Sequence, residues 1–321
     1  MKQVEHLLGY RASIKVMDAT LRDGGLVNDF YFTDDFVKAL YKTNLEAGVD
    51  YMEMGYRASK KVFDETKFGK WKFCSDDHIR EIVGENDTDL KLAIMADIGR
   101  HDKNDFDEKV NSPVDMVRVA AYIHQMPEAI DMIEDAHKKG YETTCNIMAI
   151  SQTQESDLKV ALDMLGKTPV DTIYIVDSFG SIYPEEMKRI VDIYMEAATK
   201  YGKQLGVHAH NNQQLAFANT IEACGDGVNW LDATYKGMGR GAGNCAMELL
   251  LGFLKNPKYN TYPVFRFISD YMVKLEEDGV VWGYDLQYLM TGQLNQHPRT
   301  AIKFTKDKRK DYAEFYKELI V

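Results

Sequence analysis

The feature that most constrains the fold is a regular alternation of short apolar runs with longer amphipathic stretches. Several of the apolar runs are nearly continuous, which is typical of parallel strands that helices cover from outside. The eight runs are Lys15–Leu21, Val49–Tyr56, Leu90–Asp97, Val114–Ala121, Glu142–Ile150, Val170–Ser178, Gln204–Asn211 and Trp230–Met238. Eight such strand–helix units predict a TIM barrel over residues 1–255, with a doubly wound parallel sheet as the alternative.

The amphipathic stretches predict the helices of this barrel. Thr33 is suited to cap a helix over Asp34–Ala47, and Gly48 is suited to end it. Further helices are predicted from Ser75 onward and over 126–139, 155–165, 184–201, 213–224 and 244–255. Residues 256–321 show no strand pattern and predict a small helical region that serves as a lid, a dimer interface or a partner surface. Its helices are predicted over Val264–Glu277, Tyr284–Gly292 and Lys308–Leu319.

Composition excludes several classes of function. The 39 basic and 50 acidic residues give a net charge of −11, and no basic run is present, so binding to nucleic acid or to an anionic membrane is not expected. No apolar run is long enough to span a bilayer, and Met1–Arg11 lacks the apolar core of a signal peptide. The four cysteines are far apart without a CxxC pair, which indicates a reducing compartment, and we expect a cytoplasmic protein.

The most informative motif is His-Ala-His-Asn-Asn at residues 208–212, where the seventh predicted strand ends. Side chains two residues apart on a strand point to the same side, so His208 and His210 are presented together. Asp23 follows the first strand, which barrel closure brings to the same mouth. Two imidazoles and a carboxylate suit a divalent metal ion. The alternative is a pair of polar, hydrogen-bonded histidines.

Two further segments lie at the same predicted mouth. Arg22 precedes Asp23 and would stabilise a developing oxyanion there, or would form an ion pair that closes the barrel. The segment Gly237–Asn244 has four glycines at alternate positions, so that its backbone, at Gly239 and Gly241 in particular, can approach a ligand or form a tight turn. Three other histidines are predicted to lie on helix surfaces or loops: His78, His137 and His297.

Four motifs together resemble those of the DRE-TIM metallolyase family, which includes hydroxymethylglutaryl-CoA lyase, isopropylmalate synthase and 4-hydroxy-2-oxovalerate aldolase. They are DATLRDG near the N-terminus, VDSFGS, HAHNN and GMGRGAGN, and they occur in the family's order across the barrel. The length and the form of the last motif are most similar to the 4-hydroxy-2-oxovalerate aldolase branch. The resemblance implies a divalent-metal-dependent aldolase that cleaves or forms 4-hydroxy-2-oxo acids, yielding pyruvate and an aldehyde.

The resemblance also implies roles for individual residues. Asp23, His208 and His210 would bind the metal, typically Mn²⁺, with Mg²⁺, Co²⁺ or Zn²⁺ as alternatives, and Asn244 falls where some relatives have a further ligand. Ser178 would bind the substrate carboxylate, and Arg22 would stabilise the enolate. A homodimer and a partner aldehyde dehydrogenase are further expectations.

One position departs from the aldolase branch, which has a histidine acid–base three residues after the metal-binding aspartate. Here that position is Leu26. We therefore expect another base, from His124 or Tyr56, or from a tyrosine of the C-terminal helices, Tyr284 or Tyr288. A Claisen-type acyl-CoA synthase or lyase with the same metal site, and a non-catalytic oxo-acid binding protein, are the alternative functions.

Overall fold

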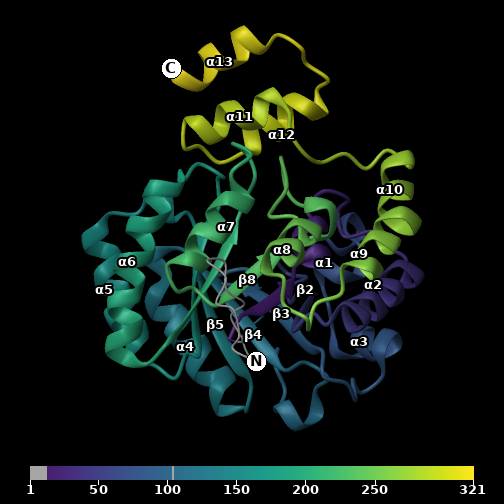
Figure 1. Cartoon of the computed structure of the whole chain (residues 1–321), viewed down its shortest axis with the longest axis vertical. Coiled ribbons are helices and arrows are strands. Elements are labelled where there is room, and N and C mark those ends of the chain that lie inside the picture. Colours follow the sequence, from purple (N-terminus) through teal and green to yellow (C-terminus); the bar gives the residue numbers. More distant parts are fainter. Residues whose placement is uncertain (1–12, 103–104) are drawn as a thin grey trace, which may run out of the picture.

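The computed structural model describes residues 13–102 and 105–321. Its strands form a closed parallel barrel in which each strand pairs with the next along the chain and the eighth pairs with the first (Figure 1). The strands are β1 (Lys15–Asp18), β2 (Tyr51–Tyr56), β3 (Lys91–Asp97), β4 (Met116–Ala121), β5 (Glu142–Ile147), β6 (Thr172–Asp177), β7 (Gln204–Ala209) and β8 (Trp230–Ala233). The predicted TIM barrel is confirmed, and the pairing of β1 with β8 excludes the doubly wound sheet.

The helices of the barrel surround the strands. They are α2 (Asp34–Ala47), α3 (Asp76–Val83), α4 (Met126–Lys138), α5 (Glu155–Gly166), α6 (Pro184–Tyr201), α7 (Ala216–Gly225) and α8 (Met247–Leu254). The predicted caps of α2 are confirmed: the Thr33 hydroxyl accepts the N–H of Phe36 at 3.2 Å, and Gly48 ends the helix with a φ of 73°. No helix in the described ranges is both long and apolar enough to cross a bilayer.

Five strands, β1 and β5 to β8, end earlier than predicted, and the differences at β1 and β8 shape the barrel mouth. β1 stops at Asp18 and not at Leu21. The Asp18 carboxylate accepts two hydrogen bonds from Thr20, one from the main-chain N–H at 2.9 Å and one from the side-chain hydroxyl at 2.5 Å, and these bonds turn the chain. The chain then turns into the short helix α1 (Thr20–Gly24). β8 stops at Ala233 and not at Met238, because a 3₁₀ turn covers Tyr235–Gly237. Arg22 and Asp23 therefore lie on a helical turn after a strand.

The interior of the barrel has an apolar layer and a charged layer. Alternate residues of a strand point to the same side. Mostly large apolar side chains from six strands form a separate buried cluster. Two residues further along three of these strands lie the buried charged residues Glu53, Arg118 and Asp232. The cluster consists of Met17, Tyr51, Ala93, Met116, Tyr174, Val176 and Trp230. The charged layer lies on the side of the carboxyl ends of the strands, where catalytic groups of TIM barrels lie.

The C-terminal region is helical, as predicted, but its helix bounds differ. The helices are α9 (Thr261–Phe267), which continues through a π turn at Ile268–Met272 into α10 (Val273–Glu277), then α11 (Leu286–Gln293), α12 (Arg299–Lys306) and α13 (Tyr312–Ile320). α12 was not predicted. α9 packs on α2 and α8 at the outer wall of the barrel. α11, α12 and α13 lie together at one end of the molecule (Figure 1), where Ala301, Phe304 and Phe315 form a small core of their own.

Asn295, just after α11, attaches this helical group to the loops that follow β5 and β6. Its side-chain oxygen accepts the hydroxyls of Ser151 at 2.7 Å and Ser181 at 3.0 Å. Its amide nitrogen donates to the main-chain oxygen of Ser151 at 3.0 Å. The helical group is therefore held against the loops at the carboxyl ends of the barrel strands.

We predict that Asn295→Ala loosens this attachment. The change removes three hydrogen bonds, each worth about 0.5–1.5 kcal/mol. It also places alanine at a φ of 51°, which asparagine adopts more readily. Hydrogen exchange should accelerate in residues 286–320 and stay unchanged in the barrel strands. The control is Gln293→Ala, an exposed neighbour. Native protection of residues 286–320 in Asn295→Ala would contradict the prediction.

Candidate metal centre

Three potential metal ligands converge at the mouth of the barrel. Asp23 comes from α1, His208 from β7 and His210 from the position just after β7. One ligand atom from each lies within 4.8 Å of the others, and all three side chains are buried. The Nε2 atoms of both histidines are buried without a hydrogen-bond partner, and that of His210 lies 3.5 Å from an Asp23 carboxylate oxygen. Unpartnered imidazole nitrogens beside a carboxylate are the donor set that fits a divalent metal ion.

The second ring nitrogen of each histidine is held by a hydrogen bond. The Nδ1–H of His208 donates to Asp232 at 2.9 Å, and that of His210 donates to the main-chain oxygen of Asp177 at 3.0 Å. These bonds fix the tautomer that leaves each Nε2 free for a metal. Burial lowers the pKa of His210 to about 4, although Asp23 opposes that shift. The ring is therefore neutral at neutral pH, as a ligand must be.

Asp23 is prepared as an anionic ligand. Burial alone would raise its pKa, but His210 and Arg22 outweigh burial and hold the pKa well below its usual value. Arg22 donates from Nη1 to Oδ1 of Asp23 at 2.8 Å. The Asn244 amide donates to the other carboxylate oxygen at 2.6 Å, while its own oxygen is buried and unpartnered. Asn244 thus orients Asp23 and offers one more oxygen at the same centre.

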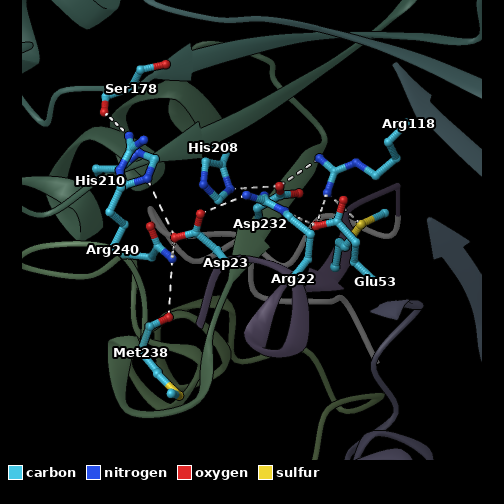
Figure 2. A network of polar contacts seen from close by, with 12 residues as sticks. Arg22, Asp23, Glu53, Arg118, Ser178, His208, His210, Asp232, Met238 and Arg240 are labelled. Atoms are coloured by element: carbon cyan, nitrogen blue, oxygen red, sulfur yellow. Dashed lines mark hydrogen bonds and ion pairs between the residues drawn. The ribbon is translucent and has the colours of Figure 1, made fainter. Parts of the chain in front are cut away.

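Behind the ligands lies a chain of alternating charges, which we call the buried charge network: Asp23, Arg22, Glu53, Arg118 and Asp232 (Figure 2). Arg22 donates from Nε to Glu53 at 2.7 Å, and Arg118 lies 3.0 Å from Glu53 and donates to Asp232 at 2.7 Å. Arg118 and Glu53 are fully buried. Because buried charges are costly unless paired, this alternation fixes where each group can lie.

The ligands open into a cavity at the barrel mouth. One end is formed by Arg22, Asp23 and the two histidines, and the walls carry Leu26 together with other apolar and aromatic side chains. The remaining lining residues are Tyr56, Met95, Ala120, Tyr122, Asn146, Met148, Val176, Ser178, Phe179, Arg240 and His297. The cavity therefore combines a metal-binding end with mostly apolar walls, as small-molecule sites usually do.

Of the residues predicted to bind substrate, Arg22 and Ser178 line the cavity, whereas Gly239 and Gly241 do not. Ser178 lines the cavity, and its hydroxyl oxygen accepts the N–H of Ala149 at 2.8 Å. Gly239 lies so close to the centre that a Cβ atom would be 2.2 Å from the Asn244 amide nitrogen and 2.6 Å from an Asp23 carboxylate oxygen. Gly241 has a φ of 66°, and a Cβ atom there would lie 3.3 Å from the ring of Tyr288.

Three of the four residues proposed as the missing base, His124, Tyr284 and Tyr288, lie outside the cavity lining. His124 is exposed and its ring stacks on Tyr122. Tyr284 is 56% exposed. The hydroxyl of Tyr288 lies 3.4 Å from that of Thr305. None of the three is among the residues that line the cavity, whereas Tyr56 is. Burial raises the pKa of Tyr56 well above its usual value, so its phenol stays protonated.

The sequence analysis gave no role to the two basic side chains Arg240 and His297 of the cavity. Arg240 lies inside the glycine-rich loop that the sequence singled out, but no role was predicted for it. His297 was predicted to be a surface or loop residue, yet it follows α11 and lines the cavity. Asn295 and Pro298, on either side of His297, indicate a loop in the sequence. They do not indicate where that loop lies, because its position depends on how the C-terminal helices pack on the barrel.

Comparisons with known proteins agree with this geometry. A family model described as HMGL-like matches residues 13–266. Oxaloacetate decarboxylase of Mycobacterium tuberculosis is 28% identical over 75% of this chain and 69% of the relative. A 4-hydroxy-2-oxovalerate aldolase of Bacillus cereus is 24% identical over 96% of this chain and 92% of the relative. The N-terminal domain of a protein assigned as an aldolase from Bacteroides vulgatus superposes with a TM-score of 0.77 at 30% identity, covering 91% and 97% of the chains.

We predict that Gly239→Ala weakens metal binding without unfolding the barrel. The added methyl group must displace Asn244 or Asp23. Disturbing a group that orients a ligand typically costs about 10- to 100-fold in affinity. A calorimetric Mn²⁺ titration measures this loss. Gly252→Ala in α8, where a Cβ atom meets nothing within 4 Å, is the matched control and should bind Mn²⁺ as the native protein does. Equal affinities in the two variants would contradict the close approach.

Proposed function

Because the chain belongs to the HMGL-like family, we propose that it is a divalent-metal-dependent aldolase that cleaves or forms 4-hydroxy-2-oxo acids, with pyruvate and an aldehyde as the products of cleavage. The relatives reported above are aldolases and a decarboxylase, and the chain is accordingly a carbon–carbon lyase. The observation that carries the proposal is the convergence of Asp23, His208 and His210, with unpartnered Nε2 atoms, next to Arg22 in one cavity.

Asp23, His208 and His210 would hold the metal, with the side-chain oxygen of Asn244 as a candidate further ligand. We propose Mn²⁺, with Mg²⁺, Co²⁺ or Zn²⁺ as alternatives, because mixed imidazole and carboxylate donors suit these ions. When bound, the ion supplies a Lewis acid for the keto oxygen of a 2-oxo acid. The homodimer and the partner aldehyde dehydrogenase stay predictions.

Arg22 is the group in this chain that is placed to stabilise negative charge. Its Nε and one Nη1 hydrogen are committed to Glu53 and Asp23, which leaves its other N–H groups for the cavity. Because Glu53 and Asp23 hold the guanidinium in place before the substrate arrives, little reorganisation is needed when charge develops on the keto oxygen. Arg22 therefore serves as the electrostatic stabiliser of the enolate.

Ser178 is placed to orient the substrate carboxylate. Because its oxygen already accepts the N–H of Ala149, its own hydrogen is free to donate into the cavity. Gly239 allows the loop after β8 to lie against Asp23 and Asn244. Small acids of the pyruvate type match this arrangement.

A second candidate function, decarboxylation of a 2-oxo acid that carries a carboxylate on C3, is favoured by Leu26. Aldol cleavage requires a base for the 4-hydroxyl proton, and Leu26 lies in the cavity at the position where the resemblance to the aldolase branch implies a histidine. Decarboxylation requires no such base, since the electrons of the broken C–C bond pass into the enolate while CO₂ leaves. The similarity to a decarboxylase supports the same alternative.

The test is product release from a panel of substrates, with Mn²⁺ and with a chelator. We expect Mn²⁺-dependent release of pyruvate and aldehyde from 4-hydroxy-2-oxo acids. His208→Ala should abolish turnover and keep the fold, because the ring is a ligand and not part of the apolar cluster. Release of CO₂ from oxaloacetate without any aldol cleavage would favour the decarboxylase. Turnover that survives complete metal removal would contradict both.

Arg22→Lys should lower kcat by about 10²–10³-fold with little change in KM, because lysine keeps the charge and loses the planar fork that contacts Glu53 and Asp23. Steady-state kinetics on the best substrate of the panel measures this. Arg57→Lys is the control, since Arg57 is also buried and paired, to Asp76, but does not line the cavity. It should alter stability and leave kcat native. A native kcat in Arg22→Lys would remove Arg22 from the mechanism.

A further inference from the structure

Arg240 is a cation in the cavity that the proposed chemistry does not use. Its Nη2 donates to the main-chain oxygen of Ser178 at 2.8 Å (Figure 2), and its Nε is buried without a partner. Within the described part of the chain, no carboxylate forms an ion pair with Arg240. A partly buried guanidinium without an anion is costly, and a bound anion would compensate that cost.

His297 lies beside Arg240 and adds a second donor. Its Nδ1 accepts the main-chain N–H of Arg299 at 3.1 Å, so the neutral ring carries its proton on Nε2. Burial, together with the charges of Arg240 and Arg299, lowers the pKa of His297 to about 3, which keeps the ring neutral. The Nε2 atom lies 3.4 Å from Nη1 of Arg240. Two N–H donors therefore face the same small region, and a shared anionic oxygen would satisfy both.

When the charges of the site are added, the positive charge of Arg240 is not balanced. The buried charge network contains three carboxylates and two guanidiniums, a net charge of minus one. A divalent ion and the single carboxylate of a 2-oxo acid bring that centre to neutrality. Of the other carboxylates at the mouth, Asp97 pairs with Arg100, and Asp177 accepts the N–H groups of Ser181 and Ile182. A second negative charge on the substrate would balance Arg240.

We infer that Arg240 and His297 bind a carboxylate carried by the aldehyde half of the substrate, so that the substrates are 4-hydroxy-2-oxo acids with a second acidic group. The inference rests on the proposed function, which places the first carboxylate at the metal centre and Ser178. One guanidinium and one neutral imidazole match the single charge of a carboxylate. The apolar side chains of Leu26, Met95 and Met148 line the same cavity and suit the carbon chain between the two acidic groups.

Aldol addition of pyruvate to matched aldehydes tests the inference. Glyoxylate is paired with acetaldehyde, and succinic semialdehyde with butanal, so that each pair differs in one carboxylate. The native enzyme should prefer the acidic member. Arg240→Gln should lower kcat/KM for the acidic aldehydes by about 10- to 100-fold, the value of a charge-assisted hydrogen bond, and change the neutral ones less than about threefold. His297→Leu should shift the same ratio by a smaller factor.

The control is Arg100→Gln. Arg100 also lowers the pKa of His297, but unlike Arg240 it forms an ion pair with a carboxylate, Asp97. It should leave the ratio of acidic to neutral substrates native. Equal losses on both members of each pair in Arg240→Gln would mean that Arg240 binds the carboxylate common to all substrates, and would overturn the inference. So would a native enzyme that uses neutral aldehydes as well as acidic ones.

A binding experiment separates this inference from the proposed function. Calorimetry on the Mn²⁺-loaded protein compares 2-oxoglutarate with 2-oxopentanoate, which have the same chain length and differ in the second carboxylate. We expect tighter binding of 2-oxoglutarate, lost in Arg240→Gln. If no aldehyde is turned over and this difference is still found, the aldol function fails and the acid-binding pair stands. If aldehydes are turned over and the difference in binding is absent, the aldol function stands and the inference about Arg240 and His297 fails.

Discussion

The structure depends on one constraint, the pairing of charges that have no access to water inside the barrel. Arg118 contacts Glu53 on one side and Asp232 on the other, with the Tyr174 ring 4.5 Å from its guanidinium. Asp232 in turn holds His208, and Glu53 holds Arg22. Because an unpaired charge there would be costly, each member has one favourable position. The metal-binding end of the cavity is therefore fixed by the interior of the barrel and not only by its loops.

The loops at the mouth are shaped by local backbone requirements. The chain leaves β1 early because Asp18 bonds to Thr20, and this turn carries Asp23 to the ligand position. The loop after β8 approaches so closely that Gly239 has no room for a side chain. A rigid barrel with such loops gives precise placement of the ligands, while the segment between α11 and α12 adds His297 to the cavity wall. The cavity is therefore built from the barrel loops together with the C-terminal helical region.

Much of this was predictable from periodicity and spacing. Runs of apolar residues located every strand, since burial of a strand on both faces requires them. The period of two in His208 and His210, with Asp23 after another strand, anticipated the cluster that the structure contains. The exact ends of β1 and β8 were not predicted, because apolar residues continue past the point where hydrogen bonds turn the chain. Of the four residues expected to supply the base, Tyr56 lines the cavity and His124, Tyr284 and Tyr288 do not.

By itself the sequence determined the barrel, its helices, the metal-binding residues proposed here and the kind of chemistry that they suit. These follow from patterns within a few residues or from motifs at strand ends, whose relative positions the closed barrel dictates. Only the tertiary structure decided which residues of the C-terminal region reach the cavity. That depends on how α11 to α13 pack on the loops of the barrel, through contacts such as those of Asn295 with Ser151. Such contacts join residues far apart in the chain, and no local period records them.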